Sequence, residues 1–157
     1  MSENILSYDI PAIKECQQNR FPLLFIDKID SCIPGSYAQG VKCFSYNEWY
    51  FPAHFEDQPN VPGFIQIEVL VQTFLMTFLT LDQHKGKKTN FISVDNVKFK
   101  KQIIPGDKLI IESQLLSFKR GIAKGISIGK VDGLLVCSAE FVVAIPDVLS
   151  SYKPKNN

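Results

Sequence analysis

The feature that most constrains the fold is a strongly apolar segment from residue 61 to residue 81. It is long enough to suggest a membrane span, but it contains Gln66, Glu68 and Gln72 among its apolar residues. A carboxylate at that depth would be costly in lipid. A soluble helix that is apolar on nearly every side is instead one that protein surrounds. The segment therefore predicts a buried helix at the centre of the domain, opened by Pro62 and Gly63 and about 27 Å long.

The rest of the chain predicts one short helix and several strands. Asp9 as N-cap and Pro11 in the first turn favour a short helix over residues 9–18. The Asp132-Gly133 pair between two apolar runs indicates a hairpin. Strands are expected at residues 23–29, 37–46, 91–103, 108–118, 123–130 and 134–145. This order predicts an α+β fold in which an antiparallel sheet wraps around one long central helix.

Length and composition indicate a single domain. The chain has 157 residues, of which 45% are hydrophobic, enough for one core. We expect the domain to span residues 9–147, with a flexible N-terminus at 1–8 and a flexible C-terminal tail at 148–157. The 17 basic and 16 acidic residues nearly cancel, so the overall charge favours neither nucleic acid nor an anionic membrane as partner.

Cysteine usage and the N-terminus indicate the compartment. The four cysteines form no Cys-x-x-Cys pair and no metal-ligand spacing, and only two histidines are available as further ligands. Residues 1–18 carry acidic side chains and lack the apolar run of an export signal. We therefore expect free thiols, no metal and a cytoplasmic location.

The two histidines are candidates for acid–base chemistry. His84 lies in the polar stretch Asp82-Gln83-His84-Lys85, which predicts a solvated surface side chain. His54 lies in the proline- and aromatic-rich loop 49–62, where aromatic neighbours could exclude water and bring its basicity close to neutral pH. At this point His54 can equally be a structural residue.

Glu68 is the second candidate, because a carboxyl group in an apolar helix must be paired, protonated or functional. Gln72 lies four residues further on, on the same helix face, and could orient the carboxyl group. The alternative is that Glu68 marks a polar helix edge at a subunit contact.

Gly63 supplies the third element, since the backbone N–H groups at a helix start are unpaired and lie at the positive end of the helix dipole. Eliminating water from a 3-hydroxyacyl thioester needs a base for the C2 proton, an acid for the leaving hydroxyl, and a donor to the thioester oxygen. His54, Glu68 and the Gly63 N–H supply one of each.

Over nearly its whole length, the chain resembles the FabZ-type 3-hydroxyacyl-[acyl-carrier-protein] dehydratases. The combined order and spacing of several motifs is specific to this resemblance, although each motif alone is weak. The motifs are Asn19-Arg20-Phe21-Pro22, Asp27-Lys28, His54-Phe55, Pro62-Gly63, Ile67-Glu68 with Gln72, Asp95-Asn96-Val97-Lys98-Phe99, Pro105-Gly106-Asp107 and Arg120-Gly121.

The resemblance implies a single hot-dog fold, a (3R)-3-hydroxyacyl thioester on acyl carrier protein as substrate, and no cofactor. It implies a homodimer in which His54 of one chain faces Glu68 of the other, with an acyl tunnel beside the central helix. Assembly into a trimer of dimers stays open. It further implies docking of the acidic carrier protein on basic residues, for which the candidates are Lys98, Lys100, Lys101, Lys119, Arg120 and Lys124.

The loop after the histidine departs from the family pattern. Ala53 replaces the usual glycine, and Glu56 and Asp57 place two extra carboxylates near His54, where they would favour the protonated imidazole if they approached it. This departure keeps open the alternative of a hot-dog protein that binds acyl thioesters or carrier protein without catalysis. An enoyl-CoA hydratase is a second alternative.

Overall fold

The computed structural model describes residues 4–154, which form three helices and one seven-stranded sheet. Expectations for residues 1–3 and 155–157 lie outside the described residues. In chain order the elements are β1 (Leu6–Tyr8), α1 (Ile10–Cys16), β2 (Lys28–Ile33), β3 (Tyr37–Cys43), α2 (Gly63–Leu79), β4 (Asn90–Phe99), β5 (Lys108–Lys119), β6 (Ile122–Val131), β7 (Leu134–Ala144) and α3 (Pro146–Ser150).

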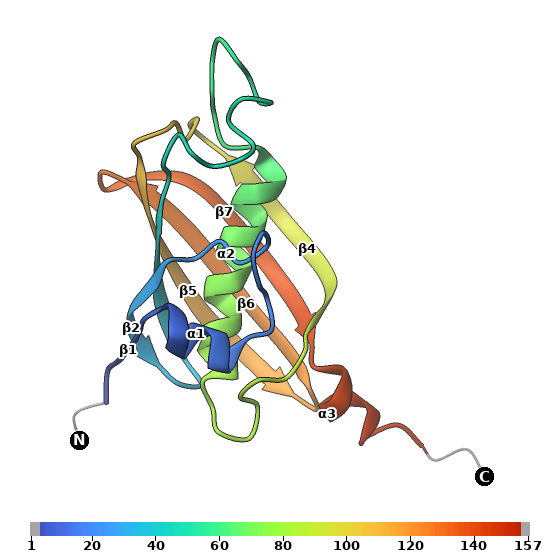
Figure 1. Ribbon diagram of the computed structural model, residues 1–157. Helices are drawn as coiled ribbons and strands as arrows, with labels where there is room; N and C mark the ends of the chain where they lie inside the picture. Colours follow the sequence, from blue (N-terminus) through green and yellow to red (C-terminus); the bar gives the residue numbers. More distant parts are fainter. Residues whose placement is uncertain (1–3, 155–157) are drawn as a thin grey trace.

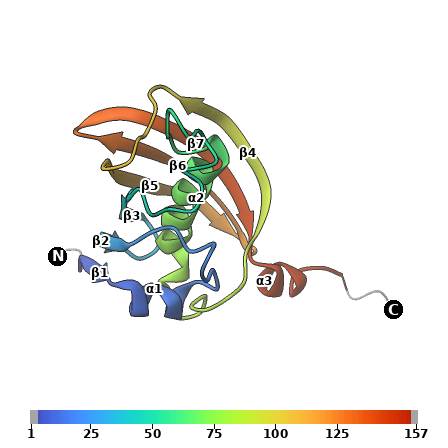
Figure 2. The same ribbon diagram turned by 45° about the horizontal axis from the view of Figure 1, so that its top comes forward.

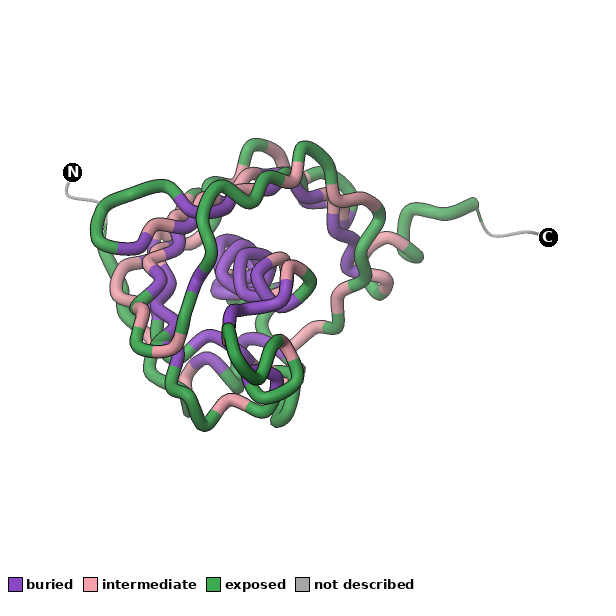
Figure 3. The backbone as a smooth tube through the Cα atoms, turned by 90° about the horizontal axis from the view of Figure 1, so that it is seen from above, coloured by how far each residue is buried: buried purple, intermediate pink, exposed green. Residues whose placement is uncertain are grey.

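The sheet is antiparallel throughout and has the strand order β1-β2-β3-β5-β6-β7-β4. It curves around α2, as Figures 1 and 2 show. Viewed from above, α2 lies at the centre and is buried along most of its length, with the rest of the chain around it (Figure 3). The prediction of a hot-dog fold, with an antiparallel sheet wrapped around one long helix, is confirmed.

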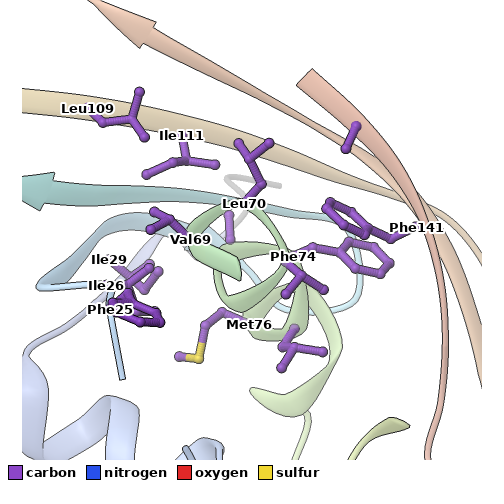
Figure 4. Packing of buried hydrophobic residues seen from close by; sticks show 14 of the residues in the cluster. Phe25, Ile26, Ile29, Val69, Leu70, Phe74, Met76, Leu109, Ile111 and Phe141 are labelled. Carbon is purple, nitrogen blue, oxygen red and sulfur yellow. The ribbon is translucent and has the colours of Figure 1, made fainter. Parts of the chain in front are cut away.

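Close contact between α2 and the sheet depends on two glycines on the strands. A Cβ atom at Gly40 would lie 2.3 Å from Oγ1 of Thr73, and one at Gly125 would lie 2.2 Å from the ring of Phe74. Because neither glycine has a side chain, the helix packs directly on the strands, with Phe74 stacked at 5.9 Å on Phe141 of β7 (Figure 4). Across residues 4–154, we find no helix with both the length and the hydropathy to cross a membrane.

The predicted strand at residues 23–29 is wrong for most of its length, because β2 begins only at Lys28. Residues 23–25 run beside α2, and their backbone bonds to a side chain of the helix instead of to a strand. The Gln72 amide donates to the Leu23 carbonyl at 2.6 Å and accepts from the Phe25 N–H at 2.8 Å. The Gln72 side chain thus supplies the backbone hydrogen bonds that a neighbouring strand would have supplied if residues 23–25 had formed the predicted strand.

Two short elements lie near the chain ends within the described residues. Leu6–Tyr8, placed in the flexible N-terminus, pairs with β2. The Asp9 N-cap is confirmed, because its carboxylate accepts from the Ala12 N–H at 3.1 Å. Part of the predicted C-terminal tail forms α3, which follows a hydrogen bond from the Ile145 N–H to the Gly121 carbonyl.

The prediction that His84 is a solvated surface residue is wrong. His84 is only 8% exposed and its ring lies 4.7 Å from that of Phe118 on β5. Its Nδ1 atom is buried and has no hydrogen-bond partner within residues 4–154. Burial, followed by the nearby Lys87 charge, lowers the pKa of this imidazole below its ordinary value. The polar neighbours in the sequence did not reveal that the turn after α2 folds back over β5.

We predict that His84 makes the protein less stable in mild acid. The unfolded chain binds a proton at the ordinary histidine pKa of about 6.5, whereas the folded imidazole binds it only at lower pH. The free energy of unfolding should therefore fall as the pH drops below about 6.5. In urea titrations at a series of pH values, His84→Gln should show a shallower decline than wild type. Parallel declines would contradict this prediction.

Candidate active site

His54 lies in the loop between β3 and α2 and is held by a reciprocal pair of contacts with Asn60. Its Nδ1 lies 3.1 Å from the Asn60 carbonyl oxygen, and the Asn60 N–H donates to the His54 carbonyl at 2.9 Å. A carbonyl oxygen can only accept, so this contact places the proton on Nδ1. The Nε2 atom of the half-buried ring is then free to accept a proton, as a general base requires.

The cavity beside His54 includes the start of α2. It has a volume of about 350 Å³, and its lining includes Gly63, Phe99, Lys100 and Lys101. A Cβ atom at Gly63 would lie 3.0 Å from the Phe99 ring, so a side chain here would crowd the cavity wall. The Gly63 N–H belongs to the first helical turn, where N–H groups lack intrahelical acceptors. This cavity therefore contains a proton acceptor and a backbone donor.

Glu68 lies half-buried in the second turn of α2. Desolvation raises its pKa above the usual range, while the hydrogen bond from Gln72 partly opposes this shift. A raised pKa keeps the proton on the carboxyl group to higher pH, which suits a general acid.

Gln72 fixes the orientation of Glu68. Its amide nitrogen donates to Glu68 Oε1 at 2.8 Å and also to the Leu23 carbonyl, while its oxygen accepts from the Phe25 N–H. The side chain is fully buried, so its position is set by these three contacts. The segment that covers α2 thereby holds the carboxyl group in one direction.

Within one chain, His54 and Glu68 line different cavities. Glu68 lines one cavity of about 420 Å³ with Leu23, Trp49 and Phe64, and a second of about 230 Å³ with Asn19 and Leu75. Neither of these two cavities includes His54 in its lining. A single copy of the chain therefore does not bring the two side chains into one cavity.

The base of the His54 loop is anchored by a buried ion pair that the sequence analysis missed. Lys42 Nζ on β3 lies 2.5 Å from Glu48 Oε1 and 3.9 Å from Asp27 Oδ1, and the Lys42 side chain is only 6% exposed. Backbone hydrogen bonds then lead from Glu48 to Phe51 and from Phe51 to His54. An isolated lysine in a strand gives no sequence signal of this role, because its partners lie in a loop and on another segment.

The six predicted docking residues are all exposed but fall into two groups. Lys100 and Lys101 line the His54 cavity, and Lys98 lies nearby on β4. Lys119, Arg120 and Lys124 line a separate cavity of about 660 Å³ together with Tyr152 and Lys153. There the Arg120 guanidinium lies 5.9 Å from the centre of the Tyr152 ring.

The carboxylates that depart from the family pattern point to solvent. Glu56 and Asp57 are both exposed, and neither forms an ion pair with His54 in the part of the chain that the structure describes. Water screens such exposed charges. The four cysteines are free thiols. Among residues 4–154, no cluster of three or more His, Cys, Asp or Glu side chains could hold a metal ion.

Comparison with known proteins defines the class. Residues 18–143 match the model of the FabA-like domain, and the chain belongs to this family. Among its relatives are proteins named 3-hydroxyacyl-[acyl-carrier-protein] dehydratase FabZ. The one from Anoxybacillus flavithermus is 38% identical over 137 residues, covering 87% of this chain and 96% of the relative. The one from Bacillus licheniformis is 36% identical over 137 residues, covering 87% and 95%.

Solved structures share the fold at low sequence identity. The dehydratase heterocomplex ApeI:P from Xenorhabdus doucetiae matches with a TM-score of 0.72 at 13% identity, covering 85% of this chain and 90% of that one. The protein PH1136 from Pyrococcus horikoshii matches with a TM-score of 0.63 at 12% identity, covering 80% and 86%. These similarities support the hot-dog architecture and carry no argument about chemistry.

We predict that Lys42→Met destabilises the protein by about 1–3 kcal/mol, because it leaves the Glu48 carboxylate without its partner in a largely buried site. Urea unfolding of Lys42→Met, Glu48→Gln and the double variant measures this coupling. Lys28→Met is the matched control, since its ion pair with Asp30 is exposed and should be worth less than about 1 kcal/mol. Equal effects of the Lys42 and Lys28 substitutions would disprove the anchoring role.

Proposed function

We propose that this protein is a 3-hydroxyacyl-[acyl-carrier-protein] dehydratase. It removes water from a (3R)-3-hydroxyacyl thioester to give the trans-2-enoyl thioester, in fatty-acid synthesis or a related acyl pathway. The observation that carries the proposal is that the chain contains both a side chain suited to act as a base and a side chain suited to act as an acid. One is an imidazole whose Nδ1 is bound to the Asn60 carbonyl, and the other is a carboxyl group whose pKa burial raises. The FabZ relatives support the same reaction.

Each group has one task in the elimination. His54 Nε2 takes the proton from C2, and the electron pair moves toward the thioester carbonyl. The Gly63 N–H, at the positive end of α2, stabilises the negative charge that develops on the carbonyl oxygen. Glu68 then gives its proton to the 3-hydroxyl group, which leaves as water while the C2–C3 double bond forms. Because no electrons leave the substrate, the reaction requires no redox cofactor.

A homodimer joined at β4 supplies the second half of the site. β4 is an edge strand of the sheet, and its outward backbone groups are open to another strand. Large apolar side chains gather on and beside it, including Phe91 at 48%, Ile92 at 53% and Phe64 at 65% exposure. Such a surface favours association with a second copy, so that His54 of one chain meets Glu68 of the partner.

Both groups of basic residues bind the acidic carrier protein. Lys100 and Lys101 flank the His54 cavity, where the phosphate of the carrier's prosthetic arm would enter. Lys119, Arg120 and Lys124 form the second group and contact acidic side chains of the carrier. The cytoplasmic location inferred from the sequence is part of this proposal.

We predict that His54→Ala and Glu68→Gln each lower kcat by at least about 100-fold, because each removes one proton-transfer group. The rate is measured as the hydration of crotonyl thioesters of carrier protein and of coenzyme A. The reaction is monitored by the decrease in absorbance of the conjugated enoyl group. Glu68→Gln keeps the shape of the side chain, so circular dichroism and sedimentation should match wild type.

The wild-type result separates the alternatives. Turnover of the carrier-protein thioester in preference to the coenzyme A thioester supports the proposal, and the reverse preference favours a coenzyme A hydratase. Binding of the thioesters without turnover favours a non-catalytic protein. Near-normal turnover by either variant removes that residue from the mechanism.

A mixed dimer tests whether the site is shared. Co-expressed His54→Ala and Glu68→Gln chains form heterodimers with one intact site and one doubly substituted site. Random mixing should therefore restore roughly a quarter of wild-type activity, whereas each variant alone stays inactive. Differently tagged chains allow the heterodimer to be purified and assayed. No recovery in a verified heterodimer would place both residues within one chain.

A further inference from the structure

Three cavities follow one side of α2 and share lining residues. The 420 Å³ cavity and the 230 Å³ cavity have Glu68 and Phe91 in common. The 230 Å³ cavity is adjacent to one of about 220 Å³, and these two share Asn19, Leu75 and Thr89. The three cavities therefore lie in a row along α2, here called the path, which runs from the candidate acid toward the C-terminal end of the helix.

The wall that α2 contributes to this path is apolar beyond Glu68. Val71, Leu75 and Leu79 succeed Glu68 at spacings of three and four residues, which places them on one face of the helix. From Glu68 to Leu75 the helix rises about 10 Å, and to Leu79 about 16 Å. An acyl chain attached at the thioester would lie along this face.

The far end of the path is polar and positively charged. Its lining includes Gln17, Gln18, Lys87, Lys88 and Asn90. Lys87 is half-buried, and in residues 4–154 neither Lys87 nor Lys88 forms an ion pair, whereas the neighbouring Lys85 pairs with Glu15. Two cations without counter-charges therefore lie at the far end of the path, beyond the apolar wall that α2 contributes.

The segment that carries these lysines is held against α1. The Gly86 N–H donates to the Cys16 carbonyl at 2.8 Å, and the Gln18 side chain donates to the Gly86 carbonyl at 2.9 Å. The amide of Gln17 is already engaged with the Gln72 carbonyl and with Asn19. Among the polar side chains that line this end, Lys87 and Lys88 are the ones that carry a positive charge, and each ammonium group can donate to an anionic ligand.

We propose that the protein accepts 3-hydroxyacyl thioesters whose far end carries a carboxylate, with Lys87 and Lys88 binding that carboxylate. The inference rests on the proposed dehydratase function and specifies the substrate class of the same site. A plain alkyl tail long enough to pass Leu75 would place its last methylenes among amides and ammonium groups, where it gains little from burial. A carboxylate at that position gains two charge-assisted contacts.

Matched pairs of substrates test this inference. Trans-2-octenoyl, trans-2-decenoyl and trans-2-dodecenoyl thioesters of carrier protein are each compared with the enedioyl thioester of the same length. The measured quantity is the ratio of kcat/KM for the carboxylate-ended substrate to that for the methyl-ended substrate. Carrier docking and the elimination chemistry are the same in both members of a pair, so the ratio reports the far end alone.

The lysine substitutions supply the decisive comparison. Lys87→Gln/Lys88→Gln should lower the ratio by about tenfold or more at the length that reaches the lysines, while methyl-ended substrates keep their rates. Lys14→Gln/Lys28→Gln removes the same charge from exposed positions outside the path and should leave the ratio unchanged. The ratio in wild type should rise with chain length toward that optimum.

The outcomes separate the two levels of the proposal. Good activity on methyl-ended substrates with a ratio that the Lys87 and Lys88 substitutions do not change would overturn the carboxylate site and leave the dehydratase function standing. An equal fall in the ratio in the Lys14 and Lys28 control would also overturn it, because the effect would then be one of overall charge. Inactivity of wild type toward every thioester would overturn the proposed function itself.

Discussion

The structure depends on the burial of α2, a helix with almost no polar face. The curved sheet removes much of this apolar surface from water, and Gly40 and Gly125 let the strands approach the helix closely. The same burial determines the chemistry of the polar residues on the helix. Burial raises the pKa of Glu68, and the same burial of α2 stabilises the fold. One physical effect therefore produces both the hydrophobic core and the candidate acid.

Gln72 connects the fold with the candidate site. A single buried amide replaces a strand partner for Leu23 and Phe25 and also orients Glu68. On the other side, the Lys42–Glu48 ion pair and the Asn60 carbonyl hold the loop that presents His54. Glu68 is therefore fixed through contacts with a segment far away in the chain, whereas His54 is fixed mainly by contacts within and beside its own loop. Side chains held in this way meet the usual requirement for a preorganised site.

His54 and Glu68 line separate cavities within one chain, and the proposed dimer at the edge strand β4 accounts for this division. A second copy at this edge would bring a base and an acid together, while the path along α2 leads away from them toward Lys87 and Lys88. The N-terminal turns of the helix would then support the reaction, and its C-terminal turns would select the acyl chain. Under these two proposals, one face of α2 would relate the length of a substrate to the position of its reacting carbon.

The sequence by itself determined the buried helix, the antiparallel strands and the identities of the candidate groups, because periodicity and unusual residues in apolar surroundings are local signals. Only the tertiary structure decided that residues 23–25 bond to Gln72 instead of a strand, that His84 is buried against Phe118, and that Lys42 forms a buried ion pair. It also decided which lysines lie together at the end of the path. The contacts of Gln72 with residues 23–25 and of His84 with Phe118 join residues far apart in the chain, and the Lys42–Glu48 pair forms only when the loop after β3 folds back on the strand. Such contacts leave no periodic pattern in the sequence.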